Sequence, residues 1–542
     1  MSNIIESILI KRGVPLEEHE AFLNPSYEIT SHNPFLLPDM QKAVKRIVDA
    51  YNNKESIVIY GDYDVDGMTA TAILYDALQK FGLKVETYTP NRFSEGYGLN
   101  MNAMRSLART DASLVITVDC GSLSHEEIDI AGKLGLDVIV TDHHAVSETM
   151  PKAVATINPH RKDSKYPFED LAGCGVAFKL VQALQTKLKG IEEGHEKWFL
   201  DLVALGTICD IVPLLDENRM MVFWGLEVLK KTKRSGLKAL MAVAGIMPSQ
   251  VNAQKVGFVI GPRLNAAGRI ATAKSALELL TTNDNKRALE LAQQLDGLNS
   301  ARRLEQDKIF KSARSKLGSN PKDSVIIVAN NDWNEGVIGI VASKLMEQYK
   351  KPTFVLSVNE DKVKGSGRSF GDFDLAKAIS ETSNYLEKGG GHSAAGGITL
   401  LQDNIKTWQQ ALNQYYKSLK LKNQEKYLLA EEDITESSFN KLDINLVKEI
   451  SKLEPFGMGN LQPVFRLTEM SVIYVDRIGR EKNHLKMTLS DGNNKLKFVA
   501  FNPPEDWFVL PESKVDVWVN LDINEWQGCQ SVEGRILRLS QI

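Results

Sequence analysis

The sequence predicts an α/β protein in which a parallel-sheet domain is joined by a long helix to a smaller α/β domain, followed by a C-terminal OB-like β-barrel. Between residues 57 and 157, apolar Val- and Ile-rich runs alternate with helical segments, as in a buried parallel sheet. Residues 288–317 are rich in Ala, Leu, Gln, Lys, Arg and Glu and contain no Pro, which predicts one long helix. Beyond residue 463, short alternating runs have the spacing of strands in a small barrel.

The first predicted domain follows a region of short helices. Residues 1 to about 45 contain four prolines and are expected to cap this domain. Its expected strands are 57–60, 85–88, 114–118 and 138–141, and its expected helices are 67–81 and 126–134. Residues 198–209 are predicted to form an amphipathic helix, and residues 261–269 a flexible loop with two arginines.

The second predicted α/β domain contains two Gly-rich stretches, 365–369 and 389–397, and a helix is expected after the second. The other expected elements are strands at 324–329 and 353–356, a helix at 337–349, and barrel strands at 464–465, 470–475, 484–489, 496–501, 515–519 and 533–539. The predicted domains are 1–285 (cap and catalytic domain), 286–320 (connecting helix), 321–420 (second α/β domain) and 427–542 (barrel), with a polar linker at about 419–426.

Composition restricts the classes of protein to consider. The chain has 542 residues, 43% hydrophobic and 25% charged, which is ordinary for globular proteins. The formal net charge of −4 provides no general basic field, so any nucleic-acid binding depends on local patches. The four cysteines form no CxxC pair, and no signal peptide or apolar run of roughly 20 residues is present. We therefore expect a cytoplasmic protein with reduced thiols.

Three predicted strands each end in acidic or imidazole side chains. The first is followed by Asp62, Asp64 and Asp66, the second by Asp119, and the third by Asp142-His143-His144. Because βα loops meet at the carboxyl edge of a parallel sheet, these groups are expected to form one pocket. Crowded carboxylates repel one another unless a cation neutralises them, so the pocket is predicted to bind metal.

Other interpretations of residues 62–67 are an Asx turn or a calcium loop. A calcium loop requires a preceding helix and a closing glutamate, and this segment has neither. Oxygen ligands with His favour Mn²⁺ or Mg²⁺ over zinc. Two such ions sharing a carboxylate support in-line displacement at phosphorus, which predicts hydrolysis of a phosphate ester or anhydride.

The glycine stretch at 389–397 is a second candidate for phosphate binding, because glycines expose backbone N–H groups. A sharp turn is the alternative. His392 within this stretch and Arg368 in the other Gly/Ser stretch favour the phosphate interpretation. Arg263 and Arg269 are candidates for the same role, although arginines in such loops often lie free on the surface.

The motifs Gly-Asp-Tyr-Asp-Val-Asp-Gly, Val-Asp-Cys-Gly, Thr-Asp-His-His and Cys-Asp-Ile-Val-Pro-Leu resemble the four signatures of the DHH phosphoesterase family. The stretch Gly-Gly-Gly-His-Ser-Ala-Ala-Gly-Gly resembles the DHHA1 domain. The loops at 91–100 and 261–269, the long helix and the barrel narrow the resemblance to the RecJ family, over nearly the whole chain.

The resemblance implies two Mn²⁺ or Mg²⁺ ions and processive 5′-to-3′ degradation of single-stranded DNA to mononucleotides, in recombination and repair. The implied metal ligands are Asp62, Asp64, Asp66, Asp119, His143 and Asp210, with Asp119 bridging. More distant family members have a His where this chain has Tyr60. His144 is implied to contact the scissile phosphate and Asp142 to orient its neighbours, so His144, Asp142 and Asp119 are the candidate catalytic residues.

Polarity requires an anchor for the 5′ end, because metal-dependent hydrolysis has no direction of its own. The expected substrate-binding residues are Arg92, Arg263, Asn265, Arg269, Ser366, Arg368, Ser369, Gly391 and His392. The chain departs from the family at Asn334, where relatives commonly have His. Trp507, Phe508, Trp518 and Trp526 are candidates for stacking on bases or for the barrel core.

Other functions remain to be compared with this one. A DHH enzyme acting on oligoribonucleotides or cyclic dinucleotides is typically shorter and has no use for the barrel. A non-catalytic replication scaffold is expected to lack metal ligands, and a pyrophosphatase leaves the barrel unexplained. The expected partners are single-stranded DNA with a 5′ end and a helicase or single-strand-binding protein, without a membrane, and the chain is expected to be a monomer.

Overall fold

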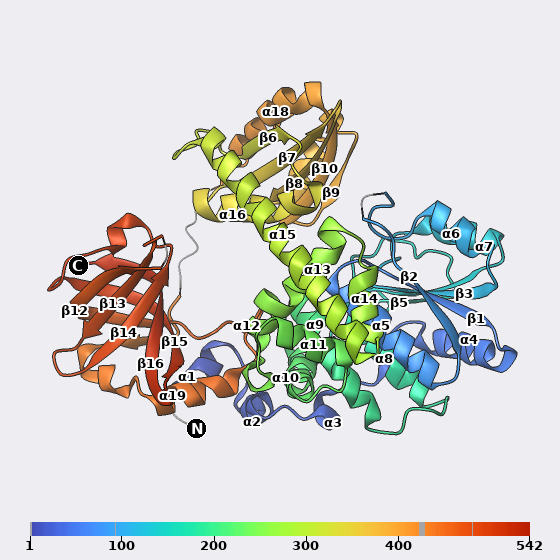
Figure 1. The fold of residues 1–542 in the computed structure, drawn as a ribbon, viewed down its shortest axis with the longest axis horizontal. Helices are drawn as coiled ribbons and strands as arrows, with labels where there is room; N and C mark the ends of the chain where they lie inside the picture. The colour runs from blue at the N-terminus through green and yellow to red at the C-terminus, as the bar shows by residue number, and fades with distance from the viewer. Residues whose placement is uncertain (1–2, 93, 422–428, 480) are drawn as a thin grey trace.

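The structure, a computed structural model, describes residues 3–92, 94–421, 429–479 and 481–542. Figure 1 shows a parallel-sheet domain and a barrel at opposite ends of the molecule, with a second sheet above them and one long helix rising between. No helix among the described residues combines the length and the apolar character needed to cross a bilayer.

The first sheet is entirely parallel, with strand order β2-β1-β3-β4-β5. Its strands are β1 (Ser56–Gly61), β2 (Lys84–Tyr88), β3 (Ala112–Val118), β4 (Asp137–Thr141) and β5 (Ala155–Ile157), and its helices are α4 (Met40–Asn53), α5 (Val65–Lys80), α6 (Met101–Leu107), α7 (His125–Lys133) and α8 (Gly173–Gln185). Ile57 and Ile59 of β1 lie in the core formed with α4, α5 and α8, whereas Val58 and Tyr60 lie in the core formed with α6 and α7. Helices thus cover both faces, which confirms the predicted parallel-sheet domain.

A helical layer follows β5 and covers the side of α5 and α8. It contains η3 (His195–Phe199), α9 (Leu200–Asp210), α10 (Asp216–Lys230), α11 (Ser235–Val243), α12 (Ala253–Lys255), η5 (Val256–Ile260), α13 (Gly261–Ile270) and α14 (Lys274–Thr281). The predicted amphipathic character of 198–209 is wrong, because every residue from Leu200 to Thr207 is buried. The predicted loop at 261–269 is also wrong. Pro262 lies in the first turn of α13. Proline is tolerated there, because N–H groups in the first turn of a helix make no intrahelical hydrogen bond.

Helix α15 (Asn285–Leu317) connects the first domain to the second sheet, as predicted. That sheet has the order β6-β7-β8-β10-β9, parallel only between β6 and β7. Its elements are β6 (Ile326–Asn331), α16 (Glu335–Tyr349), β7 (Thr353–Asn359), β8 (Lys362–Arg368), α17 (Leu375–Glu381), β9 (Lys388–Gly391), β10 (Ala395–Leu401) and α18 (Ile405–Ser418).

The helix expected after the glycine stretch at 389–397 is absent from this described segment, which forms the antiparallel pair β9–β10. The glycines have a packing role here. A Cβ on Gly389 would lie 2.7 Å from the side chain of Ile379 in α17, and a Cβ on Gly396 would lie 2.5 Å from it. Glycine therefore allows α17 to pack closely on this edge of the sheet.

The C-terminal barrel closes through β12, which pairs with both β13 and β15. Its elements are β11 (Glu432–Ile434), α19 (Ile444–Ile450), β12 (Phe465–Ile478), β13 (His484–Ser490), β14 (Lys495–Phe501), β15 (Lys514–Trp526) and β16 (Cys529–Gln541). The runs expected at 464–465 and 470–475 form the single strand β12, whose pairing register shifts between Leu467 and Met470. The predicted barrel is confirmed.

The N-terminal helices α1 (Asn3–Lys11) and α2 (His19–Leu23) pack on the barrel. Ile5, Ile8, Leu9 and Leu23 belong to the same apolar core as the barrel strands. Arg12 forms an ion pair with Glu431, 2.5 Å away. The expectation that residues 1 to about 45 cap the first domain is therefore wrong for this first half, although α4 does pack on that domain. The expected linker at 419–426 lies largely outside the described residues.

Candidate active site

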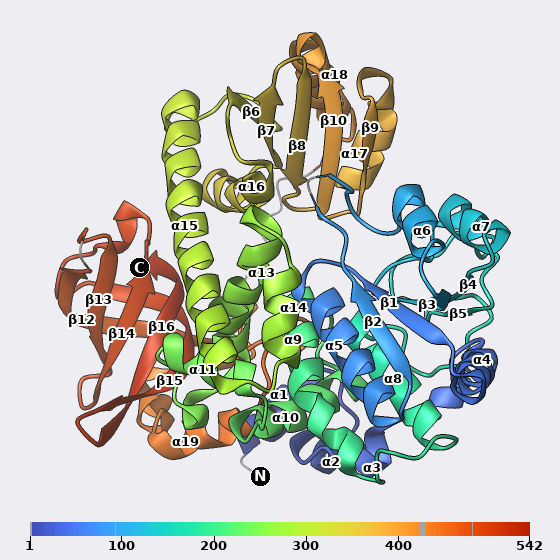
Figure 2. The ribbon, with the colours of Figure 1, turned by 45° about the vertical axis from the view of Figure 1, so that its right-hand side comes forward.

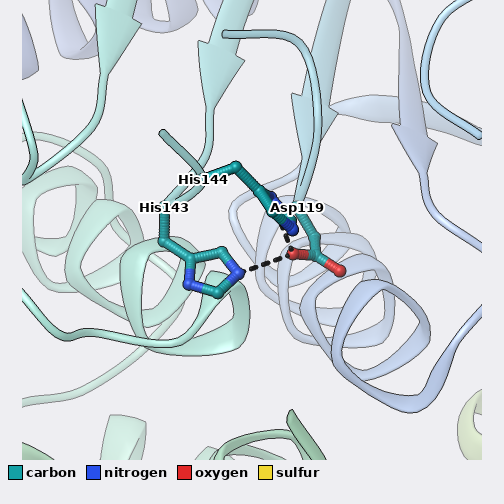
Figure 3. Close-up of side chains that lie close together, drawn as sticks. All are labelled: Asp119, His143 and His144. Carbon is teal, nitrogen blue, oxygen red and sulfur yellow. Dashed lines mark ion pairs between the residues drawn. The ribbon is translucent and has the colours of Figure 1, made fainter. Parts of the chain in front are cut away.

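Seven acidic and imidazole side chains meet at the carboxyl edge of the first sheet. Asp62, Asp64 and Asp66 follow β1, Asp119 follows β3, and His143 and His144 follow β4, while Asp210 is the last residue of α9. Figure 3 shows His143 and His144 directed toward the Asp119 carboxylate. Asp119 has a left-handed backbone with φ of 60°, a conformation that Asp adopts more readily than most residues and that turns the chain at the end of β3.

The side chains form three overlapping groups of possible metal ligands. In each group the ligand atoms lie within 4.8 Å of one another; the groups are Asp119-His143-His144, Asp66-His143-Asp210 and Asp62-Asp64-Asp119. The Nε2 atom of His143 lies 3.1 Å from Oδ1 of Asp119 and 3.6 Å from Oδ2 of Asp210. Asp119 and His143 each belong to two groups, so the three groups form one continuous cluster.

The cluster has the chemistry of a cation site. Oδ1 of Asp62, Oδ1 of Asp119 and Nε2 of His143 are buried without a hydrogen-bond partner in the described structure. Unpaired buried polar atoms are costly, and here they lie beside one another. A divalent cation would satisfy them, and the excess of oxygen over nitrogen ligands fits Mn²⁺ or Mg²⁺.

The carboxylates are held on their outer sides by backbone groups. The N–H groups of Gly173 and Cys174, at the N-terminus of α8, donate to Asp66 over 2.6 and 2.9 Å. Asp64 is the N-cap of α5 and accepts from the N–H of Gly67. These contacts orient the carboxylates before any cation binds.

Mutual repulsion is visible in the pKa values of the carboxyl groups. Burial, followed by the charges of Asp66 and Asp64, raises the pKa of Asp119 well above its usual range. The same causes raise the pKa of Asp210 to about 8. Burial lowers the pKa of His143 and so favours the neutral imidazole that ligates metals.

Asp142 and His144 form an ion pair beside the cluster. His144 Nδ1 lies 2.8 Å from Oδ1 of Asp142, which also accepts the backbone N–H groups of both histidines. Burial opposes the charged imidazole, but the hydrogen bond and charge of Asp142 outweigh it and raise the pKa of His144 to about 9. His144 therefore carries a positive charge near neutral pH. The expected orienting contact of Asp142 is present in the structure.

Three arginines form a separate basic pocket. Arg92 lies over the ring of Tyr63, 5.2 Å from its centroid, and Arg269 reaches the carbonyl of Gly336 across the domain boundary. Burial, then the charges of Arg92 and Arg302, lower the pKa of Arg269 to about 10. Burial and Arg92 lower the pKa of Arg368 too. Among the described residues, none of the three arginines has an ion-pair partner. Their positive charges are therefore not neutralised by the protein and can attract an anion.

The other expected substrate-binding residues have different surroundings. Ser366 accepts a hydrogen bond from Arg368, and Ser369 donates to the carbonyl of Phe373. Asn265 lines the large cavity between the cluster and the barrel. Arg263, by contrast, forms an ion pair with Asp296 of α15 and donates to the carbonyl of Val259. The ion pair links α13 to α15, and the expected role of Arg263 in phosphate binding stays a prediction.

Gly391 and His392 lie at the exposed turn between β9 and β10. The N–H of His392 donates to the carbonyl of Ala395 over 2.8 Å. No described contact connects His392 to the metal cluster. Asn334 is the N-cap of α16, and its side chain accepts a hydrogen bond from the N–H of Gly336.

A cavity of about 960 Å³ lies between the end of α9, helix α13 and the barrel. Its lining includes Cys209 and Ile211, on either side of Asp210, and Phe501 and Arg535 of the barrel. Ile211 has φ of 63°, which is strained for a β-branched residue and is a feature found often at functional sites. The cavity therefore begins beside Asp210 in the sequence and extends to the barrel surface.

The aromatic residues that line the cavity differ from those expected. They are Phe258, Phe456 and Phe501, and Phe258 is 73% exposed. Trp507 and Phe508 pack against the barrel core, and Trp518 lies between Arg466 and Arg538. The side chain of Trp526 lies outside the described part of the structure.

Three further site residues are not indicated by the sequence patterns used above. The hydroxyl of Tyr97 lies 3.2 Å from Nδ1 of His144, and Asn158 donates to the carbonyl of His144 over 2.9 Å. Asn158 follows β5, so the rule that polar residues gather at strand ends could have identified it. Arg302 of α15 lines the cavity, and no local pattern in a helix of mixed charge distinguishes it.

Comparison with protein families matches residues 56–207 to the DHH family, N-terminal domain, residues 322–418 to the DHHA1 domain, and residues 435–537 to the RecJ OB domain. The chain is similar to the single-stranded-DNA-specific exonuclease RecJ of Bacillus subtilis, with 38% identity over 96% of this chain and 66% of that protein. It is 33% identical to the Haemophilus influenzae protein of the same name, over 92% of this chain and 90% of the relative.

The fold is similar to that of RecJ from Thermus thermophilus. The crystal structure of that protein in complex with Mn²⁺ has a TM-score of 0.85 and 28% identity, and covers 99% of this chain and 76% of the other. A second crystal structure is in complex with Mg²⁺, with a TM-score of 0.79, 26% identity, and coverage of 99% of this chain and 74% of the other. These matches extend over all three sheets.

Proposed function

The chain belongs to the RecJ family of single-stranded-DNA-specific exonucleases, and from this premise we propose that it degrades single-stranded DNA from the 5′ end to mononucleotides. The observation that carries the proposal is the cluster of seven acidic and imidazole side chains, with three unpaired buried atoms, near an arginine pocket and a cavity that reaches the barrel. We propose that a strand passes through the cavity, so that its end reaches the arginines and a phosphodiester reaches the cluster. We propose roles in recombination and repair, in the cytoplasm, with a helicase or single-strand-binding protein as partner.

The proposed cation ligands are Asp62, Asp64, Asp66, Asp119, His143 and Asp210. Two Mn²⁺ or Mg²⁺ ions would supply an activated water and neutralise charge during in-line displacement at phosphorus. Asp119 is suited to bridging, because it belongs to two ligand groups. His144 is suited to contact the scissile phosphate, because Asp142 keeps its imidazole charged and Asn158 fixes its backbone.

Arg92, Arg269 and Arg368 are proposed to bind the terminal 5′-phosphate. Arg92 and Arg269 come from the first domain and Arg368 from β8, so the pocket joins the domains. The Arg368 guanidinium already donates to Ser366 Oγ and the Gly367 carbonyl, which fixes its plane. A terminal phosphate would neutralise arginines that otherwise repel one another. This anchor would give the reaction its 5′-to-3′ direction.

The test is digestion of single-stranded and duplex DNA, labelled at one end or the other, with Mn²⁺ or Mg²⁺. We expect a 5′ label to appear first as a mononucleotide and a 3′ label to appear in progressively shorter strands. Duplex DNA with blunt ends should persist. Release of mononucleotides first from the 3′ end would contradict the proposed polarity, and equal digestion of duplex DNA would contradict the proposed substrate.

A further inference from the structure

Arg302 lies on the long helix α15, at the wall of the large cavity. Its guanidinium is half-buried and has no described ion-pair partner. Burial, then the neighbouring charge of Arg303, lower its pKa, so the protein holds a cation there at a cost. This charge is therefore available to an anion from outside the chain.

The guanidinium is fixed by two amide side chains on the same face of the helix. Its Nη2 donates to Oδ1 of Asn299 over 3.0 Å, and its Nη1 donates to Oε1 of Gln306 over 3.5 Å. Asn299 and Gln306 are both buried, which is unusual for amides on an otherwise polar helix. Because a guanidinium has five N–H groups, these two contacts leave three donors, of which Nε–H is buried without an acceptor. The amides therefore set the orientation of Arg302 without neutralising it.

The cavity walls differ in charge. Arg269 and Arg302 lie on the wall formed by the first domain and α15. The opposite wall, from the barrel and the segment before it, carries Glu454, Asp522 and Glu533 beside Arg535. Burial and then the charge of Asp522 raise the pKa of Glu454, which shows that this wall is locally acidic. A phosphodiester backbone in the cavity would therefore lie nearer the arginine wall.

We propose that Arg302 binds an internal phosphate of single-stranded DNA, on the 3′ side of the scissile bond. This inference rests on the proposed function, since it requires the strand to run from the metal cluster through the cavity to the barrel. The long helix then acts as part of the strand-binding surface as well as a connector. Asn299 and Gln306 are positioning residues for Arg302.

The experiment measures binding of the full-length chain to two fluorescent 20-nucleotide strands, one with a 5′-hydroxyl and one with a 5′-phosphate, in EDTA to prevent hydrolysis, between 50 and 200 mM NaCl. A phosphate contact in single-stranded DNA contributes about 0.7 to the slope of log affinity against log salt. Arg302→Ala should make the slope shallower by about this amount, and it should weaken binding roughly tenfold at the lowest salt. Arg302→Lys should retain the slope, because it retains the charge.

Arg303→Ala is the matched control, because Arg303 is the adjacent residue, is exposed and does not line the cavity. Its slope should equal that of the unchanged chain. An unchanged slope for Arg302→Ala, whatever its affinity or melting temperature, would mean that Arg302 is only structural and would overturn the inference. A loss restricted to 5′-phosphorylated strands would also overturn it, because Arg302 would then belong to the terminal pocket. If the unchanged chain neither binds nor degrades the strand, the proposed function fails as well.

Discussion

At the scale of single residues, Asp119 is the side chain on which the candidate metal site depends most. It is buried, its Oδ1 has no hydrogen-bond partner, and two ligand groups share it. Asp119→Ala should remove the link between two ions and lower kcat by several powers of ten. The measurement is release of mononucleotides from labelled single-stranded DNA. Asp111→Ala, on the exposed surface, is the control, and retention of more than about a tenth of the activity by Asp119→Ala would refute the two-ion assignment.

The pH dependence of metal binding is a second prediction at this scale. Asp210 has its pKa raised to about 8 by burial and by Asp66 and Asp64. The pKa of this carboxyl is about 8 in the folded protein and near 4 in the unfolded protein. Its contribution to the stability of the metal-free protein is therefore complete below pH 4 and is lost as the pH rises through about 8. Cations compete with these protons, so the increase in Tm caused by Mn²⁺ should be larger at pH 8 than at pH 6.

Thermal unfolding with Mn²⁺ or with EDTA, at both pH values, measures this difference. Asp210→Asn removes the titrating group and should reduce the dependence on pH. An equal or larger increase in Tm at pH 6 would show that protons and cations do not compete at this site.

Arg368 provides the residue-scale test of the 5′ anchor. Arg368→Ala should cost roughly 2–4 kcal/mol in kcat/KM with a 5′-phosphorylated strand, the scale for losing one partner of a buried charged pair. With a 5′-hydroxyl strand the loss should be much smaller. We propose to measure kcat/KM for both ends in both proteins. Equal losses would show that Arg368 binds an internal phosphate or is structural.

At the scale of secondary-structure elements, α16 lies against β8 through Gly339. A Cβ at this position would lie 2.9 Å from Ser366 Oγ and 3.1 Å from Nη2 of Arg368. Gly339→Ala should therefore displace the Arg368 guanidinium and reduce the preference for 5′-phosphorylated over 5′-hydroxyl strands. The control is Gly297→Ala in α15, where a Cβ would meet nothing within 4 Å. It should leave the preference unchanged and stabilise the protein by about 1 kcal/mol.

The measurement is the ratio of kcat/KM for the two strand ends, together with Tm. A Gly339→Ala protein that keeps the full ratio would show that the glycine is not needed for the placement of Arg368. A loss of Tm without a change in ratio would point instead to packing between α16 and β8.

The elements also show which features a sequence can predict. Strand-end side chains such as Asp119 are predictable because alternating apolar runs and the geometry of parallel sheets determine where strand ends meet. The loop prediction for residues 261–269 is wrong because a helix with Gly and Pro at its start resembles a loop locally, and only packing against α15 shows otherwise. The helix expected after residues 389–397 is wrong because their glycines serve the approach of α17, a tertiary contact without a local signal, whereas phosphate binding by this stretch stays a prediction. Arg302 has no sequence signal for the same reason, since its significance lies in the cavity wall.

At the scale of the whole molecule, the two ends of the chain share one hydrophobic core. Ile5, Ile8 and Leu9 pack among the barrel strands, and Arg219 of the first domain donates to the carbonyls of Phe22 and Leu453. Figure 1 shows α1 next to β16 and α19, although they are far apart in the sequence, and Figure 2 shows the barrel and the parallel-sheet domain on opposite sides of α15. The sequence could not reveal this contact, because the apolar face of a short helix does not indicate its partner. The catalytic domain, the N-terminal helices and the barrel are therefore linked in a closed arrangement.

This arrangement determines how removal of the barrel should be tested. A chain ending at Leu421 would retain every proposed metal ligand but expose the apolar face of α1, and we expect it to aggregate. A fragment of residues 26–421 lacks that face and should remain monodisperse.

On strands of a few nucleotides, the kcat of this fragment should stay near that of the full chain, since the cluster and arginine pocket are intact. On long strands it should bind more weakly and release the strand after fewer cleavages, because the cavity has lost the wall that carries Phe501 and Arg535. Run length, measured with a trap of unlabelled DNA, distinguishes the outcomes: equal run lengths for the fragment and the full chain would show that the barrel does not hold the strand.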